Sequence, residues 1–194
     1  MADGHTKPET MQETDVIELL LAQHGMIRNL FDEVEQAPAD RRQEAFTRLV
    51  RLLAVHETAE EEIVHPFARA EIDGGEGVVD DRLAEEREAK ELLQHMDEAG
   101  TEDRDFTKNL LMLRAAVEAH ARSEERYEFN KIIQHTTAAQ RRAMGAGVKA
   151  AEAMAPTHPH PGTESASKNL LVGTPVAMMD RARDAIRQAL GKRS

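Results

Sequence analysis

The sequence contains no cysteine and no tryptophan, and only 3% of its 194 residues are aromatic. Without cysteine the chain can form no disulfide, no thiolate nucleophile and no zinc–thiolate or iron–sulfur site. Any metal must therefore be held by nitrogen and oxygen ligands. A sheet core usually contains more aromatic and β-branched residues, whereas Ala, Glu, Arg and Leu, which are abundant here, are good helix formers. The composition therefore favours an all-α fold.

Long apolar runs and an excess of positive charge are also missing. No segment approaches the roughly 18 consecutive apolar residues that a membrane-spanning helix needs, and the polar segment 1–14 lacks the apolar region of a signal peptide. The formal net charge is −11, which argues against nucleic acid and anionic membranes as main partners. We therefore expect a cytoplasmic protein that binds neither nucleic acid nor membrane.

Apolar residues recur at intervals of three and four in four long segments, which is the spacing of amphipathic helices. Pro38, the glycines at 74–77 and Gly100 separate these segments. Four long helices joined by short polar turns predict an up-down-up-down four-helix bundle. The expected helix starts are Thr14 or Asp15, Asp40, residue 78 and Thr101.

We divide the chain into three parts. Residues 1–13 are expected to be disordered, 14–135 to form the bundle, and 136–194 to form a helical extension. The extension contains a helical stretch at about 137–153, a loop with two His-Pro pairs, and an amphipathic helix at about 175–190. The apolar stripe of this last helix must pack either on the bundle or on a second subunit, and the second arrangement would give a homodimer.

Polar residues interrupt the apolar stripes at related positions in the two halves of the bundle. His56 and Glu60 lie four residues apart, and so do His120 and Glu124, 64 residues further along the chain. Residues spaced by four share one helix face, one turn apart. The first and third stripes carry His24 and Glu86 at corresponding heights. Four helices are thus predicted to direct three imidazoles and three carboxylates into one layer of the core.

A carboxylate in an apolar core costs several kcal/mol unless it is paired or bound to a cation. No Lys or Arg lies within one turn of Glu60 or Glu124 on the same stripe. A single buried imidazole such as His24 is more often a hydrogen-bonded core residue than a ligand, but six such residues at one height favour a binuclear metal site. Nitrogen and oxygen donors suit iron or manganese, and zinc less well.

Several residues beside these positions are candidates for roles other than metal ligation. Tyr127 follows Glu124 by three residues on the same stripe, and a phenolate oxygen is a good ferric ligand. We interpret Tyr127 as a catalytic or site residue, with simple packing as the alternative. His65 is placed near a helix end. The flanking glutamates are expected to face solvent or to contact the ligands from outside: Glu57, Glu61, Glu62, Glu85 and Glu125.

The order of these motifs resembles that of hemerythrin-like proteins, the family of the HHE cation-binding domain. Segment 20–24 matches the family's first element, 56–61 followed by Pro66 matches the second, and 120–125 matches the fourth. The resemblance covers about 14–135, and the tail is similar to that of actinobacterial members. The third element departs from the family pattern, because Glu86 occupies a position where the family usually has histidine.

The resemblance implies a di-iron centre with an oxo or hydroxo bridge between two iron ions. Glu60 and Glu124 would be the bridging carboxylates, and Glu86 would place an anion where an imidazole is usual. The implied metal ligands are His24, His56, Glu60, Glu86, His120 and Glu124.

Anionic oxygen donors favour ferric over ferrous iron, so the presence of Glu86 argues against reversible oxygen carriage. We therefore expect an enzyme with catalase-like or peroxidase-like activity, which decomposes hydrogen peroxide in defence against oxidative or nitrosative stress. Two alternatives remain open. One is a module that binds or senses oxygen, nitric oxide or iron without turnover, and the other is a bundle in which the metal is only structural. The enzyme would act on a peroxide, and the binding module would take a peroxide or a small diatomic molecule as its ligand.

Overall fold

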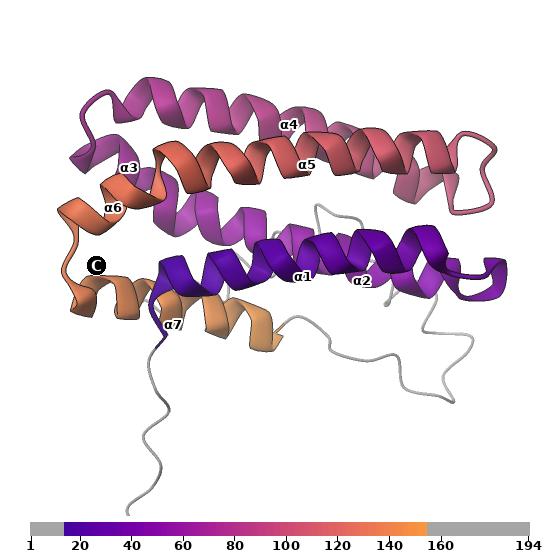
Figure 1. The fold of residues 1–194 in the computed structure, drawn as a ribbon, viewed down its shortest axis with the longest axis horizontal. Coiled ribbons are helices and arrows are strands. Elements are labelled where there is room, and N and C mark those ends of the chain that lie inside the picture. The colour runs from indigo at the N-terminus through magenta and orange to yellow at the C-terminus, as the bar shows by residue number, and fades with distance from the viewer. Residues whose placement is uncertain (1–13, 155–194) are drawn as a thin grey trace, which may run out of the picture.

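The computed structural model describes residues 14–154. The predicted last helix at 175–190, the His-Pro loop and the N-terminal segment 1–13 lie outside the described residues. The described helices, shown in Figure 1, are α1 (Val16–Gln36), α2 (Ala39–Ala59), the π-helical segment η1 (Glu60–Val64), α3 (His65–Glu71), α4 (Gly75–Ala99), α5 (Phe106–Tyr127), α6 (Phe129–His135) and α7 (Ala138–Met154).

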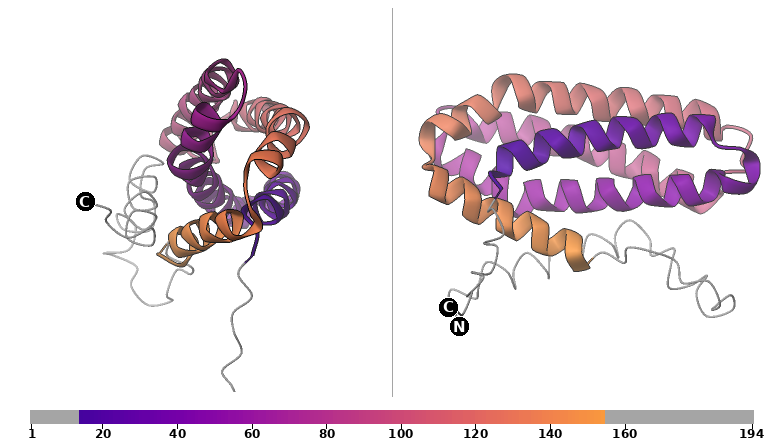
Figure 2. Two further views of the ribbon diagram at one scale, coloured as in Figure 1. Left: turned by 90° about the vertical axis from the view of Figure 1, so that its left-hand side faces the viewer. Right: turned by 60° about the horizontal axis from the view of Figure 1, so that its bottom comes forward.

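The four long helices α1, α2, α4 and α5 run alternately up and down, which confirms the predicted all-α four-helix bundle. Helix α1 packs on α2 and α5, and α4 packs on α5 and on α3, the continuation of α2. Helix α7 lies across α1 and α2 at one end of the bundle (Figures 1 and 2). Its bounds agree closely with the helical stretch expected at 137–153.

The start of α1 is fixed by local hydrogen bonds. The carboxylate of Asp15 accepts a hydrogen bond from the backbone N–H of Ile17 at 3.0 Å, which caps the helix N-terminus. The other oxygen of Asp15 accepts from Arg141 of α7 at 2.5 Å. The same residue therefore caps α1 and ties α7 to it.

The apolar core is divided into two clusters. One lies at the α7 end and includes Leu20, Val55 and Phe129. The other fills the opposite end, around the α1–α2 turn, and includes Phe31 and Phe46. In α1, α4 and α5 the polar residues of the predicted site fall between the two clusters along the chain, whereas His56 and Glu60 lie among residues of the first cluster, from Val55 to Ile63. The bundle therefore has an apolar cluster at each end, with the polar layer where the two clusters meet.

The second long helix is not α-helical throughout. After Ala59 the chain forms one π-helical turn, and the N–H of His65 donates to the carbonyl of Glu60, five residues earlier. Pro66 follows immediately, and because it has no N–H it cannot donate to the carbonyl of residue 62, as a regular α-helix would require. Widening of the helix at this position accommodates the proline. Beyond Glu60, Ile63 is buried and Phe67 packs on the first cluster, as α-helical spacing predicts, and His65 is buried as well.

Gly75 marks a close approach between α3 and α4 that leads to a stability prediction. A Cβ added at Gly75 would lie 2.0 Å from the backbone oxygen of Ala68, whereas nothing lies within 4 Å of a Cβ added at Gly77. We expect Gly75→Ala to destabilise the fold by about 1–3 kcal/mol through overpacking. Gly77→Ala is the matched control, and should stabilise α4 by about 0.5–1 kcal/mol. Urea unfolding of both variants measures the difference, and equal free energies of unfolding would contradict the packing described.

Candidate metal centre

The polar layer contains two groups of side chains whose ligand atoms lie within 4.8 Å of one another. The first group consists of His24, His56, Glu60 and Glu124. The second consists of Glu57, Glu60, Glu86 and His120. All of these residues are buried, and Glu60 belongs to both groups. The structure therefore brings together all six residues predicted as ligands and adds Glu57.

Glu60 lies between histidines of two different helices. Its Oε1 is 3.3 Å from Nε2 of His56, and its Oε2 is 3.8 Å from Nε2 of His120. The side chain of Glu60 is fully buried. One oxygen of Glu60 thus faces His56 and the other faces His120, which is the arrangement of a carboxylate that can bridge two ions.

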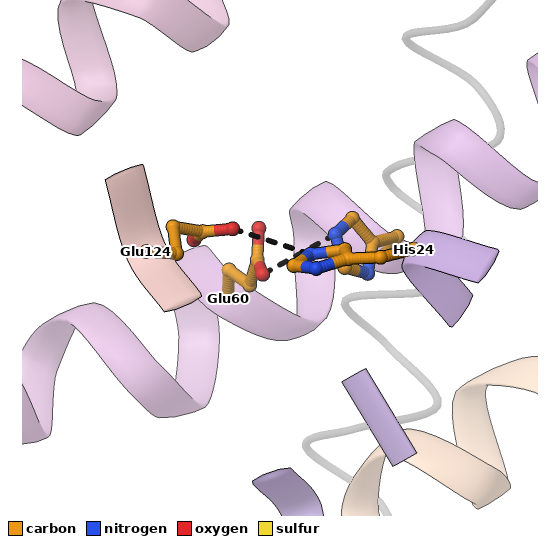
Figure 3. Close-up of side chains that lie close together, drawn as sticks. His24, Glu60 and Glu124 are labelled. Atoms are coloured by element: carbon orange, nitrogen blue, oxygen red, sulfur yellow. Dashed lines mark ion pairs between the residues drawn. The ribbon is translucent and has the colours of Figure 1, made fainter. Parts of the chain in front are cut away.

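Glu124 has a similar position between His24 and His120. Its Oε2 is 3.3 Å from Nε2 of His24, and its Oε1 is 3.5 Å from Nε2 of His120. Figure 3 shows the carboxylates of Glu60 and Glu124 side by side, facing the ring of His24. Glu124 thus faces two histidines as Glu60 does, but of the two only Glu60 belongs to both ligand groups.

Each of the three imidazoles is oriented by an oxygen on its outer side. Nδ1 of His24 is 2.8 Å from Glu125 Oε1, and Nδ1 of His120 is 3.1 Å from Glu85 Oε2. Nδ1 of His56 is 2.7 Å from the side-chain oxygen of Gln23. An oxygen acceptor at Nδ1 fixes the proton there and leaves the Nε2 lone pair directed into the layer, as is usual for metal-bound histidines.

The inner atoms of the layer are buried without hydrogen-bond partners among the described residues. They are Nε2 of His24 and His120 and both oxygens of Glu60 and Glu124. Orphaned buried polar atoms are rare and costly in native proteins. Lone pairs of nitrogen and oxygen that converge in this way fit one or more metal cations, and the donor set suits iron or manganese.

The second group contains more carboxylates and is already partly paired. Glu86 Oε1 is 2.6 Å from Nε2 of His65, and Glu86 Oε2 is 3.1 Å from Nζ of Lys90. Lys90 also contacts Glu61 and approaches Glu57 Oε2 at 3.9 Å. Protein cations and donors therefore reach this side of the layer, which sequence reasoning did not predict.

The structure corrects three predictions about individual residues. Tyr127 is 55% exposed at the end of α5, where the guanidinium of Arg126 lies over its ring. The backbone turns at this point, and Phe129 enters the core instead, stacked on His24. Tyr127 therefore takes no part in the layer.

Glu57 and His65 are the other two corrections. Glu57 was expected to face solvent or to support the ligands, but it is only 5% exposed and belongs to the second ligand group. His65 was placed near a helix end, and it is the first residue of α3, but it is also buried in the bundle beside Glu86, a position that the sequence did not predict. The sequence contains one indication of this local change in helix geometry, which is Pro66 directly after His65.

A small recess adjoins the layer. It is lined by the three layer histidines and by Ile27, Arg28 and Val117, among others. It has room for about one water-sized molecule. The recess is therefore too small for an organic substrate and places one small molecule beside the imidazoles.

Three buried carboxyl groups of the layer have strongly raised pKa values. Burial, reinforced by the charge of Glu124, raises the pKa of Glu60 to about 8. Burial and the Glu86 charge raise the pKa of Glu57 to about 8, and burial raises the pKa of Glu124 to about 8. Each group is thus held against ionisation by the dry core.

These shifts predict how the stability of the metal-free protein depends on pH. A carboxyl whose pKa is raised on folding binds more protons in the folded state, so its stabilisation is full below about pH 4.5 and is lost as pH rises to about 8. The free energy of unfolding should therefore fall by at least ~2 kcal/mol between pH 5 and pH 8, measured by urea unfolding in chelator. The metal-loaded protein should show no such fall, because metals bind deprotonated ligands. A metal-free protein that gains stability over this range would contradict the burial of these groups.

Two comparisons with solved structures and characterised proteins bear on the class. A crystal structure of a hemerythrin HHE cation binding domain-containing protein from Mycobacterium kansasii superposes with a TM-score of 0.66, covering 87% of this chain and 99% of that chain at 20% identity. A DNA nickase from Nostoc sp. is 26% identical over 148 residues, which is 76% of this chain and 42% of that protein. The chain thus spans less than half the length of that relative.

A comparison with protein-family models shows to which family the chain belongs. The model of the hemerythrin HHE cation binding domain matches residues 15–132, which include all residues of the polar layer. The chain belongs to the hemerythrin HHE cation-binding domain family, and it is therefore a metal-binding helical bundle. Within 14–154, none of the helices has the length and apolar character needed to cross a membrane.

Proposed function

We propose that the polar layer binds two iron ions and that the loaded protein decomposes hydrogen peroxide. The observation that carries this proposal is the position of Glu60, whose two orphaned oxygens face histidines on opposite sides and which belongs to both ligand groups. One metal would be held by His24, His56, Glu60 and Glu124, and the other by Glu57, Glu60, Glu86 and His120.

An iron pair, when bound, supplies the two electrons that cleavage of an O–O bond requires. The decomposition of two peroxide molecules to O2 and two waters needs no external reductant, which suits a site enclosed by two apolar clusters. The second group has three carboxylates and only one histidine, and these anionic oxygen donors favour ferric iron. They therefore disfavour reversible oxygen carriage.

The residues of the chain provide the environment for this reaction. The recess beside His24, His56 and His120 has room for about one water-sized molecule, so we place the entry of peroxide there and exclude larger substrates. Ile27 and Val117 give its wall an apolar character, and both belong to the core cluster at the α1–α2 end. The same recess would admit oxygen or nitric oxide, so a binding or sensing module without turnover is the alternative function.

The experiment is anaerobic loading of the purified protein with ferrous iron, removal of unbound metal, and addition of hydrogen peroxide at an oxygen electrode. We expect O2 release in proportion to bound iron and many turnovers per chain. His56→Ala should abolish the reaction, whereas His95→Ala, at an exposed position of α4, should leave it unchanged. A spectral change with oxygen or nitric oxide, together with no O2 release from peroxide, would favour the sensing function and reject the catalytic one.

A further inference from the structure

Lys90 is the one lysine of the described chain that reaches the polar layer. Its Nζ is 3.1 Å from Glu86 Oε2 and 3.9 Å from Glu57 Oε2, so it contacts two members of the second ligand group. Glu61, from the π-helical turn, holds the same ammonium on its outer side. The Lys90 side chain is 24% exposed. It therefore closes the second group from the solvent side.

The first ligand group contains no such cation. His24 and His56 face Glu124 and Glu60 there, and the outer side of each ring is occupied by a carboxylate or an amide oxygen. Both oxygens of Glu124 and of Glu60 are without hydrogen-bond partners among the residues described. A metal ion entering this group displaces no hydrogen bond between the ligands, and no lysine or arginine of the described residues forms an ion pair with these four ligands. Arg28 lies outside the group, 3.9 Å from Glu125.

Glu86 is held from both sides by the protein. Its Oε1 lies at 2.6 Å from Nε2 of His65, which is buried at the start of α3, and its Oε2 lies at 3.1 Å from Lys90. A metal that binds Glu86 must therefore compete with two donors that are part of the chain. Lys90 follows Glu86 by four residues on α4, so both side chains occupy the same helix face.

We propose that Lys90 is a built-in counter-ion of the second metal position and makes the two positions unequal. This inference rests on the proposed two-metal centre. The first group binds its ion tightly, and the second group binds an ion more weakly, because the ammonium shares Glu86 and Glu57 with that ion and repels it across a few ångströms. Lys90 thus determines whether the protein carries one ion or two at a given metal concentration.

Calorimetric titration of the full chain with Mn²⁺, combined with metal analysis after gel filtration, tests this proposal. The wild type should bind one ion with at least 10-fold higher affinity than the second. Lys90→Met removes the charge, and Lys90→Gln also removes it but keeps an N–H donor for Glu86. Both variants should raise the affinity for the second ion at least 10-fold and leave the first unchanged.

Two further variants complete the design. Lys90→Arg keeps the charge and should retain the weak second position, whereas Lys108→Met, at an exposed site on α5, should match the wild type. Circular dichroism verifies that each variant is folded. Two ions of equal affinity in the wild type would overturn the role of Lys90 while leaving the two-metal centre intact. No bound ion in the wild type would overturn the metal centre, and the role of Lys90 with it.

Discussion

Glu60→Gln is expected to remove both metal ions, although it changes a single residue. Glu60 is the one side chain common to the two ligand groups, and its oxygens face His56 at 3.3 Å and His120 at 3.8 Å. Loss of a partner that only supports a ligand lowers metal affinity by about 10–100-fold, so loss of a shared ligand should lower both affinities by more than ~100-fold. Metal analysis after iron loading measures the effect.

The control for this variant is Glu44→Gln, at an exposed position of α2, the helix that η1 continues. It should bind as much iron as the wild type. Glu57→Gln, in contrast, should lose only the ion of the second group. Retention of one tightly bound ion by Glu60→Gln would show that Glu60 is not shared between the two positions.

Metal removal is expected to have the largest effect on stability. Each ion that binds only the folded state stabilises it by ~4 kcal/mol at a free concentration 1,000-fold above its Kd. For a chain of this size about 1 kcal/mol corresponds to 2–4 °C in Tm. Two ions should therefore raise Tm by roughly 15–30 °C, and a strong chelator should reverse the change in differential scanning calorimetry.

The Tm of Glu60→Gln with and without metal separates the stabilisation by bound metal from the cost of burying the carboxylate. Without metal, the variant should be at least as stable as the wild type, because it removes a buried carboxylate that lies beside Glu124. With metal, its Tm should rise little. Equal Tm values for metal-loaded and metal-free wild type would show that the layer is an ordinary buried polar network.

Much of the fold could be predicted from the spacing of apolar residues. The interval of three and four residues depends only on α-helical geometry, so the sequence alone is enough to predict that one layer contains His24, His56, Glu60, Glu86, His120 and Glu124. The start of α1 followed from Asp15, whose side chain caps the backbone N–H of Ile17. Two other starts were wrong: α4 begins at Gly75 and not at residue 78, and α5 begins at Phe106, after a turn at 101–105, and not near Thr101.

The remaining features depend on departures from regular geometry and on contacts between helices. The π-helical turn brings His65, five residues after Glu60, above Glu60 through a backbone hydrogen bond, and α-helical spacing did not predict the burial of His65. Tyr127 is the last residue of α5 and is exposed beside Arg126 although it follows Glu124 by three residues, so helical spacing alone did not decide its role. The contact between Lys90 and Glu57 joins α4 to α2, and no spacing within one helix predicts it.

A crystal structure of iron-loaded protein, with anomalous differences recorded at the iron edge, tests the central claim most directly. We predict two anomalous peaks in the polar layer, one beside His24 and His56 and one beside His120, with Glu60 bound to both. A map without peaks between the two apolar clusters, or with iron only on the surface of the bundle, would contradict it.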